Sequence, residues 1–187
     1  TLEVGPHDSL PSPFAWHDID GIPGAEYTIT RGNNVYAYED RADQNAPGYS
    51  PDGDTTLTFD FPINLSNDPV TYEDAAITNL FYVNNRIHDI TYQYGFDEVA
   101  GNFQTNNYGR GGTAGDEVRA EAQDGGGTNN ANFATPPDGF NGRMQMYLWT
   151  SGSSSTTLTV NAPHPLAGTY GAVSAGFGGA IPSTPLV

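Results

Sequence analysis

The chain has 187 residues, enough for one substantial domain or for one domain and the start of another. Its 22 acidic residues outnumber 6 basic residues, and the formal net charge of −16 argues against nucleic acids and anionic membranes as partners. The absence of cysteine excludes disulfides, thiolate zinc sites and cysteine nucleophiles. Because hard cations prefer oxygen ligands, the acid excess fits calcium binding; the alternative is a charge that serves solubility alone.

The first third of the chain predicts few regular elements. Proline and glycine punctuate residues 1–34, which are expected to wrap irregularly with short strands. Val35–Tyr38 is a short strand candidate. Residues 39–55 predict an acidic, turn-rich loop. Thr56–Phe61 predicts a further strand, because its apolar side chains alternate along the chain.

The strongest helix signal covers residues 71–95. Apolar residues recur there three and four positions apart, as on one face of a helix, and Gly95 is the expected stop signal. The predicted core face consists of Ala76, Leu80, Val83, Ile87, Ile90 and Tyr94. A second stripe, which widens the buried surface, consists of Ile77, Phe81 and His88. Asn85 falls on the opposite side by helical spacing, so we expect it to be exposed.

After the helix the periodicity changes to that of strands. Alternating residues predict strands at Asn102–Tyr108, Glu117–Ala122 and Met144–Trp149, with glycine-rich turns between them. A long apolar helix combined with short alternating strands predicts an α+β domain. In this domain the helix is expected to pack on a twisted, mainly antiparallel sheet.

The composition changes near Ser151 and predicts a domain boundary. Residues 1–150 are assigned to one domain, and residues 151–157 have the Ser, Thr and Gly content of a linker. Residues 158–187 begin with Leu-Thr-Val, continue with Ala- and Gly-rich sequence, and are assigned to a separate unit.

Few residues have the spacing of a catalytic site. No two histidines have the spacing that directs both rings at one zinc ion, no H-E-x-x-H occurs, and no serine lies in a G-x-S-x-G turn. His88 is interpreted as a core histidine that bonds to the backbone or to a carboxylate; the alternative is a residue that lines a site. Three acidic loops could hold calcium: Asp18 with Asp20, Glu39 with Asp40 and Asp43, and Asp52 with Asp54. The alternative for each is an ordinary solvated loop.

The segment from Asn129 to Gly139 lacks the usual alternation. It contains three amide side chains and Phe133, and it is closed by Pro136 and Pro137. Amide side chains can hold a peptide backbone, an edge strand can pair with an extended peptide, and prolines stop further sheet growth. Two interpretations stay open for this segment: a peptide-binding edge and an ordered surface loop.

Several long blocks resemble, in unbroken order from Trp16 to Trp149, the fungalysin family of metallopeptidases. These blocks are Ala25–Asp40, Ala76–Tyr82, His88–Tyr92, Asn107–Gly112, Val118–Asp124, Asn129–Gly139 and Arg143–Trp149. Residues 158–187 resemble the opening strands of a protease-associated domain. The resemblance implies a thermolysin-like N-terminal subdomain that belongs to a secreted, extracellular zinc metalloendopeptidase.

The resemblance also divides the expected roles. The zinc ligands and the general-base glutamate are expected outside this chain, so the chain alone is expected to be inactive, with the C-terminal remainder of the enzyme and a peptide or protein substrate as partners. Zinc would polarise the scissile carbonyl and activate water. The positions that match the substrate-binding edge strand of such enzymes are Asn130, Ala131, Asn132 and Phe133. The rival hypothesis is a non-catalytic extracellular module for assembly or binding, derived from a peptidase fold.

Overall fold

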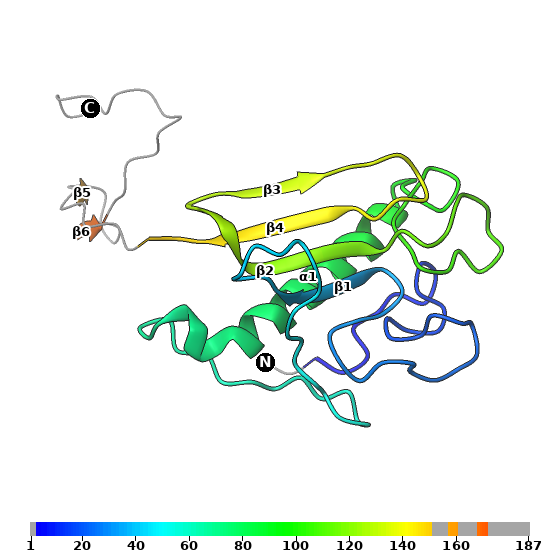
Figure 1. The fold of residues 1–187 in the computed structure, drawn as a ribbon, viewed down its shortest axis with the longest axis horizontal. Coiled ribbons are helices and arrows are strands. Elements are labelled where there is room, and N and C mark those ends of the chain that lie inside the picture. The colour runs from blue at the N-terminus through cyan, green and yellow to red at the C-terminus, as the bar shows by residue number, and fades with distance from the viewer. Residues whose placement is uncertain (1–2, 151–156, 161–167, 172–187) are drawn as a thin grey trace. The chain divides into compact units, whose positions relative to one another are not determined.

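The computed structural model describes residues 3–150, 157–160 and 168–171, and the chain divides into two compact units, Thr1–Trp149 and Thr150–Val187 (Figure 1). In chain order the elements are β1 (Val35–Glu39), the 3₁₀ helix η1 (Pro69–Tyr72), α1 (Glu73–Tyr92), β2 (Val118–Thr128), β3 (Ala131–Ala134), β4 (Arg143–Leu148), β5 (Thr157–Val160) and β6 (Gly168–Gly171). One long helix and a sheet confirm the predicted α+β class. No helix among the described residues is long and apolar enough to cross a membrane.

The first unit is built on a mixed four-stranded sheet with the strand order β1-β2-β4-β3. β1 pairs with β2 and β2 pairs with β4 in parallel, whereas β3 pairs with β4 antiparallel. The expectation of a mainly antiparallel sheet is therefore met only in part, by the pair of β3 and β4. An alternating pattern identifies a strand without revealing the direction of its neighbours, and the segment that contains α1 supplies the crossover between β1 and β2.

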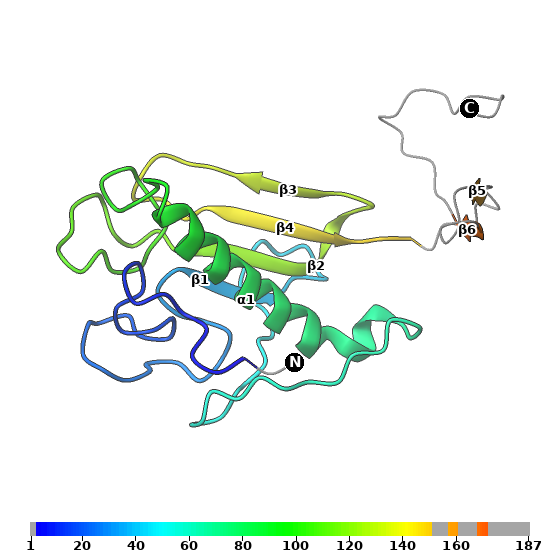
Figure 2. The same cartoon turned by 180° about the vertical axis from the view of Figure 1, so that it is seen from behind.

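Small side chains on one face of the sheet make room for α1, which lies across that face in Figure 2. Ala37 of β1 is in register with Ala120 of β2, and Ala122 follows two positions along the same face. All three alanines are buried in the core. The core cluster of buried apolar residues contains Trp16, Val35, Ala37, Ile77, Leu80, Phe81, Phe103, Val118, Ala120 and Ala122.

The helix lies inside the predicted range, but it buries a different face. Its buried residues are Ile77, Leu80, Phe81, Asn85, His88 and Asp89. From the predicted core face, Leu80 is buried, Ala76 is half-buried, and the remaining residues are exposed: Val83, Ile87, Ile90 and Tyr94. The second stripe is the one that packs on the sheet. Gly95 ends the helical segment as predicted, with φ of 93° and its N–H donating to the Tyr92 carbonyl at 3.0 Å.

Asn85 is fully buried, so the expectation that it is exposed is wrong. Its side-chain oxygen accepts a hydrogen bond from Asn34 Nδ2 at 3.1 Å, and its own Nδ2 donates to the Phe81 carbonyl at 2.9 Å. These bonds join α1 to the residue that precedes β1. A polar side chain is stable in this position because its donors and its acceptor have partners inside the protein.

Asp89 fixes the irregular N-terminal segment to α1. Its carboxylate accepts hydrogen bonds from the Asp8 N–H at 2.9 Å, Ser12 Oγ at 2.8 Å and Trp16 Nε1 at 2.9 Å, and His88 Nδ1 lies 3.1 Å away. Burial alone would raise the pKa of Asp89, but these hydrogen bonds outweigh it and hold the pKa below its ordinary value. The segment is therefore held by a charged acceptor within the helix.

Two of the expected strands are irregular in the structure. Leu57 has a φ of 52°, which interrupts Thr56–Phe61, and the Phe59 ring stacks on His17 at 5.5 Å. In Asn102–Tyr108 the Gln104 N–H donates to an Asp116 carboxylate oxygen at 2.8 Å and the Thr105 N–H donates to the Asn33 carbonyl at 2.7 Å, so that segment is held by a side chain and by loop backbone outside the named strands. The alternation in both segments reflects packing of irregular backbone against the core.

The second unit contains one described pair of strands. β5 and β6 pair antiparallel, with Thr157 opposite Gly171 and Val160 opposite Gly168. Most of the predicted linker and most of residues 158–187 lie outside the described residues. The predicted domain limits therefore stay predictions.

Candidate functional site

β3 is the outermost strand of the first unit's sheet (Figure 1). It pairs with β4 on one side, and within the part of the chain that the structure describes no strand lies along its other side. All of its residues, Ala131–Ala134, are exposed. The backbone of this edge can therefore accept a further extended chain, as edge strands do when they bind peptides.

The structure brings the sequence-predicted site residues together at this edge: Asn130, Ala131, Asn132 and Phe133. Three of them lie in β3, and Asn130 immediately precedes it; all are exposed. The turn from β2 passes through Asn129, which has φ of 57° and donates its N–H to the Leu148 carbonyl at 2.9 Å. Asn tolerates this left-handed conformation better than most residues.

Phe133 anchors β3 to the side of the sheet that carries α1. It is in register with Met144, which packs against the core, and its ring centroid lies 5.7 Å from that of Phe103. The Phe133 side chain nevertheless remains 40% exposed. Gly142 allows this close contact, because a Cβ atom there would lie only 2.9 Å from the Phe133 ring.

Asn132 points to the other side of the sheet, since successive side chains of a strand alternate. Its Nδ2 donates to Tyr147 Oη at 2.7 Å. Its register partner on β4 is Gln145, whose Nε2 donates to Asp124 Oδ2 at 2.9 Å. The exposed edge is thus connected through β4 to a group of buried acids.

This inner acid cluster consists of Asp40, Glu121 and Asp124, and one carboxylate oxygen of each lies within 4.8 Å of the others. Arg143 supplies the countercharge: its Nε donates to Glu121 Oε2 at 2.8 Å. The other donors to the cluster are Tyr38 Oη, the backbone N–H groups of Gln44, Asn45 and Gly126, and Gln145 Nε2. Every carboxylate oxygen of the inner acid cluster therefore has a donor.

The inner acid cluster links β1, β2 and β4 through side-chain hydrogen bonds. Burial raises the pKa of Glu121, although its bond with Arg143 acts in the opposite direction. Burial, followed by the charge of Glu121, also raises the pKa of the Tyr38 hydroxyl. Tyr38 therefore remains a donor to Glu121 at neutral pH, and the bonds that hold β1, β2 and β4 together are kept.

The two described histidines in the core are separate from this edge. His88 lies between Asp89 and Asn102, with its Nε2 at 3.3 Å from Asn102 Nδ2, which agrees with the interpretation as a core histidine that bonds to a carboxylate. Burial lowers the pKa of His17 to about 4, while a backbone hydrogen bond to Ile29 acts in the opposite direction. His17 is therefore neutral at ordinary pH.

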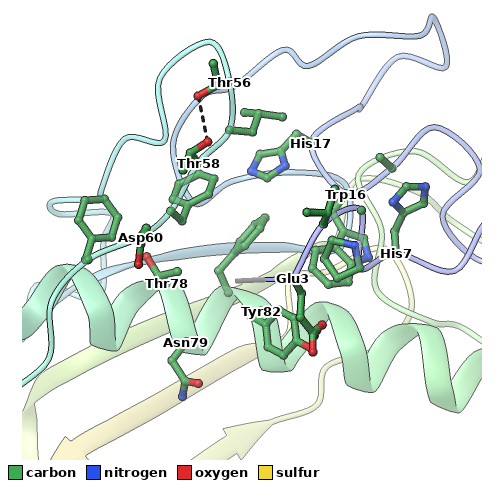
Figure 3. A pocket seen from close by; sticks show the side chains of 18 of the residues that line it. Glu3, His7, Trp16, His17, Thr56, Thr58, Asp60, Thr78, Asn79 and Tyr82 are labelled. Atoms are coloured by element: carbon green, nitrogen blue, oxygen red, sulfur yellow. Dashed lines mark hydrogen bonds between the residues drawn. The ribbon is translucent and has the colours of Figure 1, made fainter. Parts of the chain in front are cut away.

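His17 lines an apolar groove of about 660 Å³, shown in Figure 3. The groove lies between the N-terminal segment, residues 56–61 and α1, and it includes no residue of β3. Two buried polar atoms on its wall, His17 Nε2 and Thr78 Oγ1, have no hydrogen-bond partner. The groove is distinct from the sheet edge that the sequence points to.

The sequence matches the model of the family described as fungalysin metallopeptidase (M36) over residues 1–165. The chain belongs to the fungalysin metallopeptidase family. It is 51% identical over 146 residues to probable extracellular metalloproteinase 2 of Arthroderma benhamiae, and 50% identical over 146 residues to extracellular metalloproteinase 2 of Trichophyton tonsurans; both matches cover 77% of this chain and 22% of the relative. It is also 50% identical over 148 residues to probable extracellular metalloproteinase 5 of Trichophyton verrucosum, covering 77% of this chain and 23% of the relative. The chain therefore spans about a fifth of the length of these curated relatives.

The described part of this fungalysin chain does not fit a catalytic zinc site. Protein zinc sites of metallopeptidases use histidine nitrogen together with carboxylate oxygen. The described residues contain two groups of clustered possible ligands, and both consist of carboxylates alone. His88 is occupied by Asp89 and Asn102, and His17 belongs to neither group. We therefore derive no catalytic step through zinc from these residues.

Sequence reasoning missed the inner acid cluster of this family member, although Glu121 and Asp124 lie inside a block that carried the resemblance. A usable signal was present: acids occur in a strand whose other residues include Ala120 and Ala122, which are suited to close packing. A carboxylate that is buried in such a strand requires a countercharge or hydrogen-bond donors. The partner Arg143 is distant in sequence and could not be identified from spacing.

Proposed function

We propose that this chain is the N-terminal portion of a secreted zinc metalloendopeptidase and that β3 is the strand along which its substrate lies. The observation that carries the proposal is the family match over residues 1–165. The relatives' names, which describe extracellular metalloproteinases, support secretion and peptide hydrolysis for the complete protein. The exposed edge of the sheet supports the placement of the substrate.

In this proposal a peptide extends the sheet at β3. Main-chain hydrogen bonds give affinity without selecting side chains, which suits an endopeptidase that hydrolyses many sequences. The exposed amides of Asn130 and Asn132 orient the peptide, and the Asn132 side chain is already positioned by its bond to Tyr147. The half-exposed ring of Phe133 offers an apolar surface beside the peptide.

The zinc ligands and the general base belong, in this proposal, to the part of the polypeptide that this chain does not include. The chain contributes one wall of the active-site cleft, and its own residues bind and orient substrate. The outer face of α1 is the contact surface for the remainder. This apolar stripe consists of Val83, Ile87 and Ile90 of α1 and of Tyr94, which follows the helix; these residues are exposed by 39%, 50%, 50% and 88%.

The length of the relatives indicates which partner covers the apolar stripe. The relatives are several times longer than the segment they share with this chain, since the match covers 22% of the relative. A soluble domain rarely exposes a contiguous apolar helix face without a partner. We therefore assign the apolar stripe to the downstream part of the same polypeptide, which is present in the same amount as this segment because the two are covalently joined.

We further propose the division of the chain into residues 1–150, the linker 151–157 and a protease-associated-like β unit beginning at 158. A composition that changes at Ser151 supports the boundary. The separation of the compact units after Trp149 is compatible with it.

The test uses the full-length secreted protein and a quenched peptide substrate. Asn130→Ala is expected to lower kcat/KM by about 10- to 100-fold, the equivalent of about 1.5–3 kcal/mol for one polar contact in a closed site. Zinc content and the unfolding midpoint should stay unchanged, because Asn130 is exposed and precedes the strand.

The matched control is Asn67→Ala, which removes an exposed amide from a loop between β1 and α1. It should leave kcat/KM unchanged. Full activity of Asn130→Ala would reduce β3 to a scaffold role. A full-length wild-type protein that binds peptides without cleaving them would favour the rival, a non-catalytic binding module.

A further inference from the structure

A second group of acids lies in the loop that follows His17. This outer acid cluster consists of Asp18, Asp20 and Glu26, and one carboxylate oxygen of each lies within 4.8 Å of the others. Asp18 is fully buried, whereas Asp20 and Glu26 are exposed. Gly21, with φ of 81°, makes the tight turn between them.

Each carboxylate of the outer acid cluster has one oxygen held by a backbone N–H group. Gly21 donates to Asp18 Oδ1 at 2.9 Å, Ile22 donates to Asp20 Oδ1 at 2.7 Å, and Ile19 donates to Glu26 Oε2 at 2.6 Å. These bonds orient the three carboxylates within one loop. They leave the second oxygen of each carboxylate for another partner.

The second oxygen of Asp18 is the decisive atom. Asp18 Oδ2 is buried and has no hydrogen-bond partner, while Oδ1 also accepts from Tyr108 Oη at 3.0 Å. A buried carboxylate oxygen without a donor is costly, because desolvation is not compensated. An ion bound at this oxygen would remove that cost.

No basic side chain neutralises the outer acid cluster among the described residues: none of the ion pairs there includes Asp18, Asp20 or Glu26. The inner acid cluster differs in this respect, since Arg143 contacts it and each of its oxygens has a donor. Three carboxylates that share one small space repel one another. A cation is the partner that fits this arrangement.

We propose that the outer acid cluster binds one divalent cation and that this cation is calcium. The side-chain atoms available to bind a metal ion are all carboxylate oxygens. Such ligands suit hard cations and disfavour zinc and copper. Calcium accepts additional carbonyl and water ligands in a flexible shell, whereas magnesium requires a near-ideal octahedron. Two of the three ligands are exposed on an irregular loop, which favours the adaptable ion.

Binding would fasten this loop to a distant segment, residues 106–108. Tyr108 Oη already donates to Asp18, and Asn106 Nδ2 donates to the Ile19 carbonyl at 3.0 Å. The Glu26 N–H donates to the His17 carbonyl at 3.3 Å, beside the groove of Figure 3. The ion would therefore stabilise the N-terminal segment against local unfolding, with stability rising as calcium is added.

The test measures binding to the full-length protein rather than activity. After treatment with a calcium-selective chelator, equilibrium dialysis against calcium chloride, and separately against magnesium chloride, gives the number of bound ions and the affinity. Asp20→Asn and Asp18→Asn are expected to weaken calcium binding at one site by about tenfold or more, because ligand charge sets the affinity of such sites. The calcium-dependent rise in Tm should shrink in both variants.

Asp52→Asn is the matched control, since Asp52 also accepts a hydrogen bond from the backbone N–H two residues on and is also exposed. It should bind calcium as the wild type does. Comparing unfolding in calcium-free buffer verifies that each variant is folded. Equal calcium stoichiometry and affinity in the wild type and in Asp20→Asn would overturn the site, and binding of magnesium in preference to calcium would overturn the identity of the ion. Neither readout depends on peptidase activity.

Discussion

The two faces of α1 are used in opposite ways. The buried side of α1 includes Asn85, His88 and Asp89 beside its apolar residues, while the exposed side carries the apolar stripe defined above. A surface helix ordinarily turns its widest apolar stripe toward its own core. An apolar stripe therefore shows that a helix face needs a partner, but it does not show which partner covers that face.

The inward face can carry polar residues because they are bonded. Asn85 joins Asn34 to the helix, and Asp89 collects donors from the N-terminal segment. Directional bonds of this kind specify which segments meet, whereas apolar contacts alone are less selective. The outward face carries exposed apolar side chains instead, which suit it to contact with a large apolar surface.

Among substitutions on the two faces of α1, Asp89→Ala is expected to have the largest effect on the free energy of unfolding. The substitution leaves Trp16 Nε1 and Ser12 Oγ buried without their acceptor. We expect it to reduce the free energy of unfolding of the 187-residue chain by about 3–5 kcal/mol, the range for removing one partner of a buried charged group. Urea unfolding measured by tryptophan fluorescence is suitable, because Trp16 is a direct partner.

Asp60→Ala is its control, since Asp60 is exposed and should change the free energy of unfolding by less than about 0.5 kcal/mol. Equal effects at the two positions would mean that the bonds of Asp89 contribute little.

The same carboxylate makes stability depend on acid pH. The pKa of Asp89 is lowered in the folded chain, so its contribution is fully present above the unfolded value of about 3.9 and is lost as pH falls through the folded pKa. The folded state binds fewer protons in that window, so stability rises with pH there. Unfolding of the wild type and of Asp89→Asn, compared between pH 5 and pH 2, should converge as pH falls. A constant difference would contradict this linkage.

Asn85→Ala is expected to have the next largest effect. It removes one of the two acceptors of Asn34 Nδ2, the other being Ser12 Oγ, so the free energy of unfolding should fall by about 1–3 kcal/mol. Asn84, one position earlier, is the matched control, because its side chain is only half-buried and Asn84→Ala should cost less. An Asn85→Ala variant as stable as the wild type would contradict the burial of Asn85.

The sequence allowed the helix, β1, β2 and β4 to be predicted, because each pattern reports which residues one element buries. It could not reveal that β2 has parallel neighbours, since strand direction depends on the path of the chain between strands. The strand predicted at Thr56–Phe61 is absent because an alternating pattern reports which side chains are buried, not whether the backbone is extended. Phe59 is apolar because it packs on His17 and Phe81, not because its backbone is extended.

The candidate edge was located through the family resemblance, and the segment from Asn130 to Phe133 does lie at the rim of the sheet. The inner and outer acid clusters could not be separated by sequence alone. Asp18 and Asp124 are both buried acids, but one has an oxygen without a donor and the other is bonded to Gln145. That difference depends on residues far apart in the chain, such as Tyr108.

The smallest effect, and the sharpest test of the comparison, is expected from Ile87→Ser in the 187-residue chain. Serine and isoleucine have similar helix propensities, so the substitution mainly reports burial. Ile87 is half exposed, and its replacement should cost less than about 1 kcal/mol, whereas Ile77→Ser on the buried face should cost about 3–5 kcal/mol. In the full-length protein Ile87→Ser should become markedly more destabilising, because the downstream part is proposed to cover the stripe. Equally small costs in the chain and in the full-length protein, measured by urea unfolding, would show that the stripe stays open and that another surface joins the two parts.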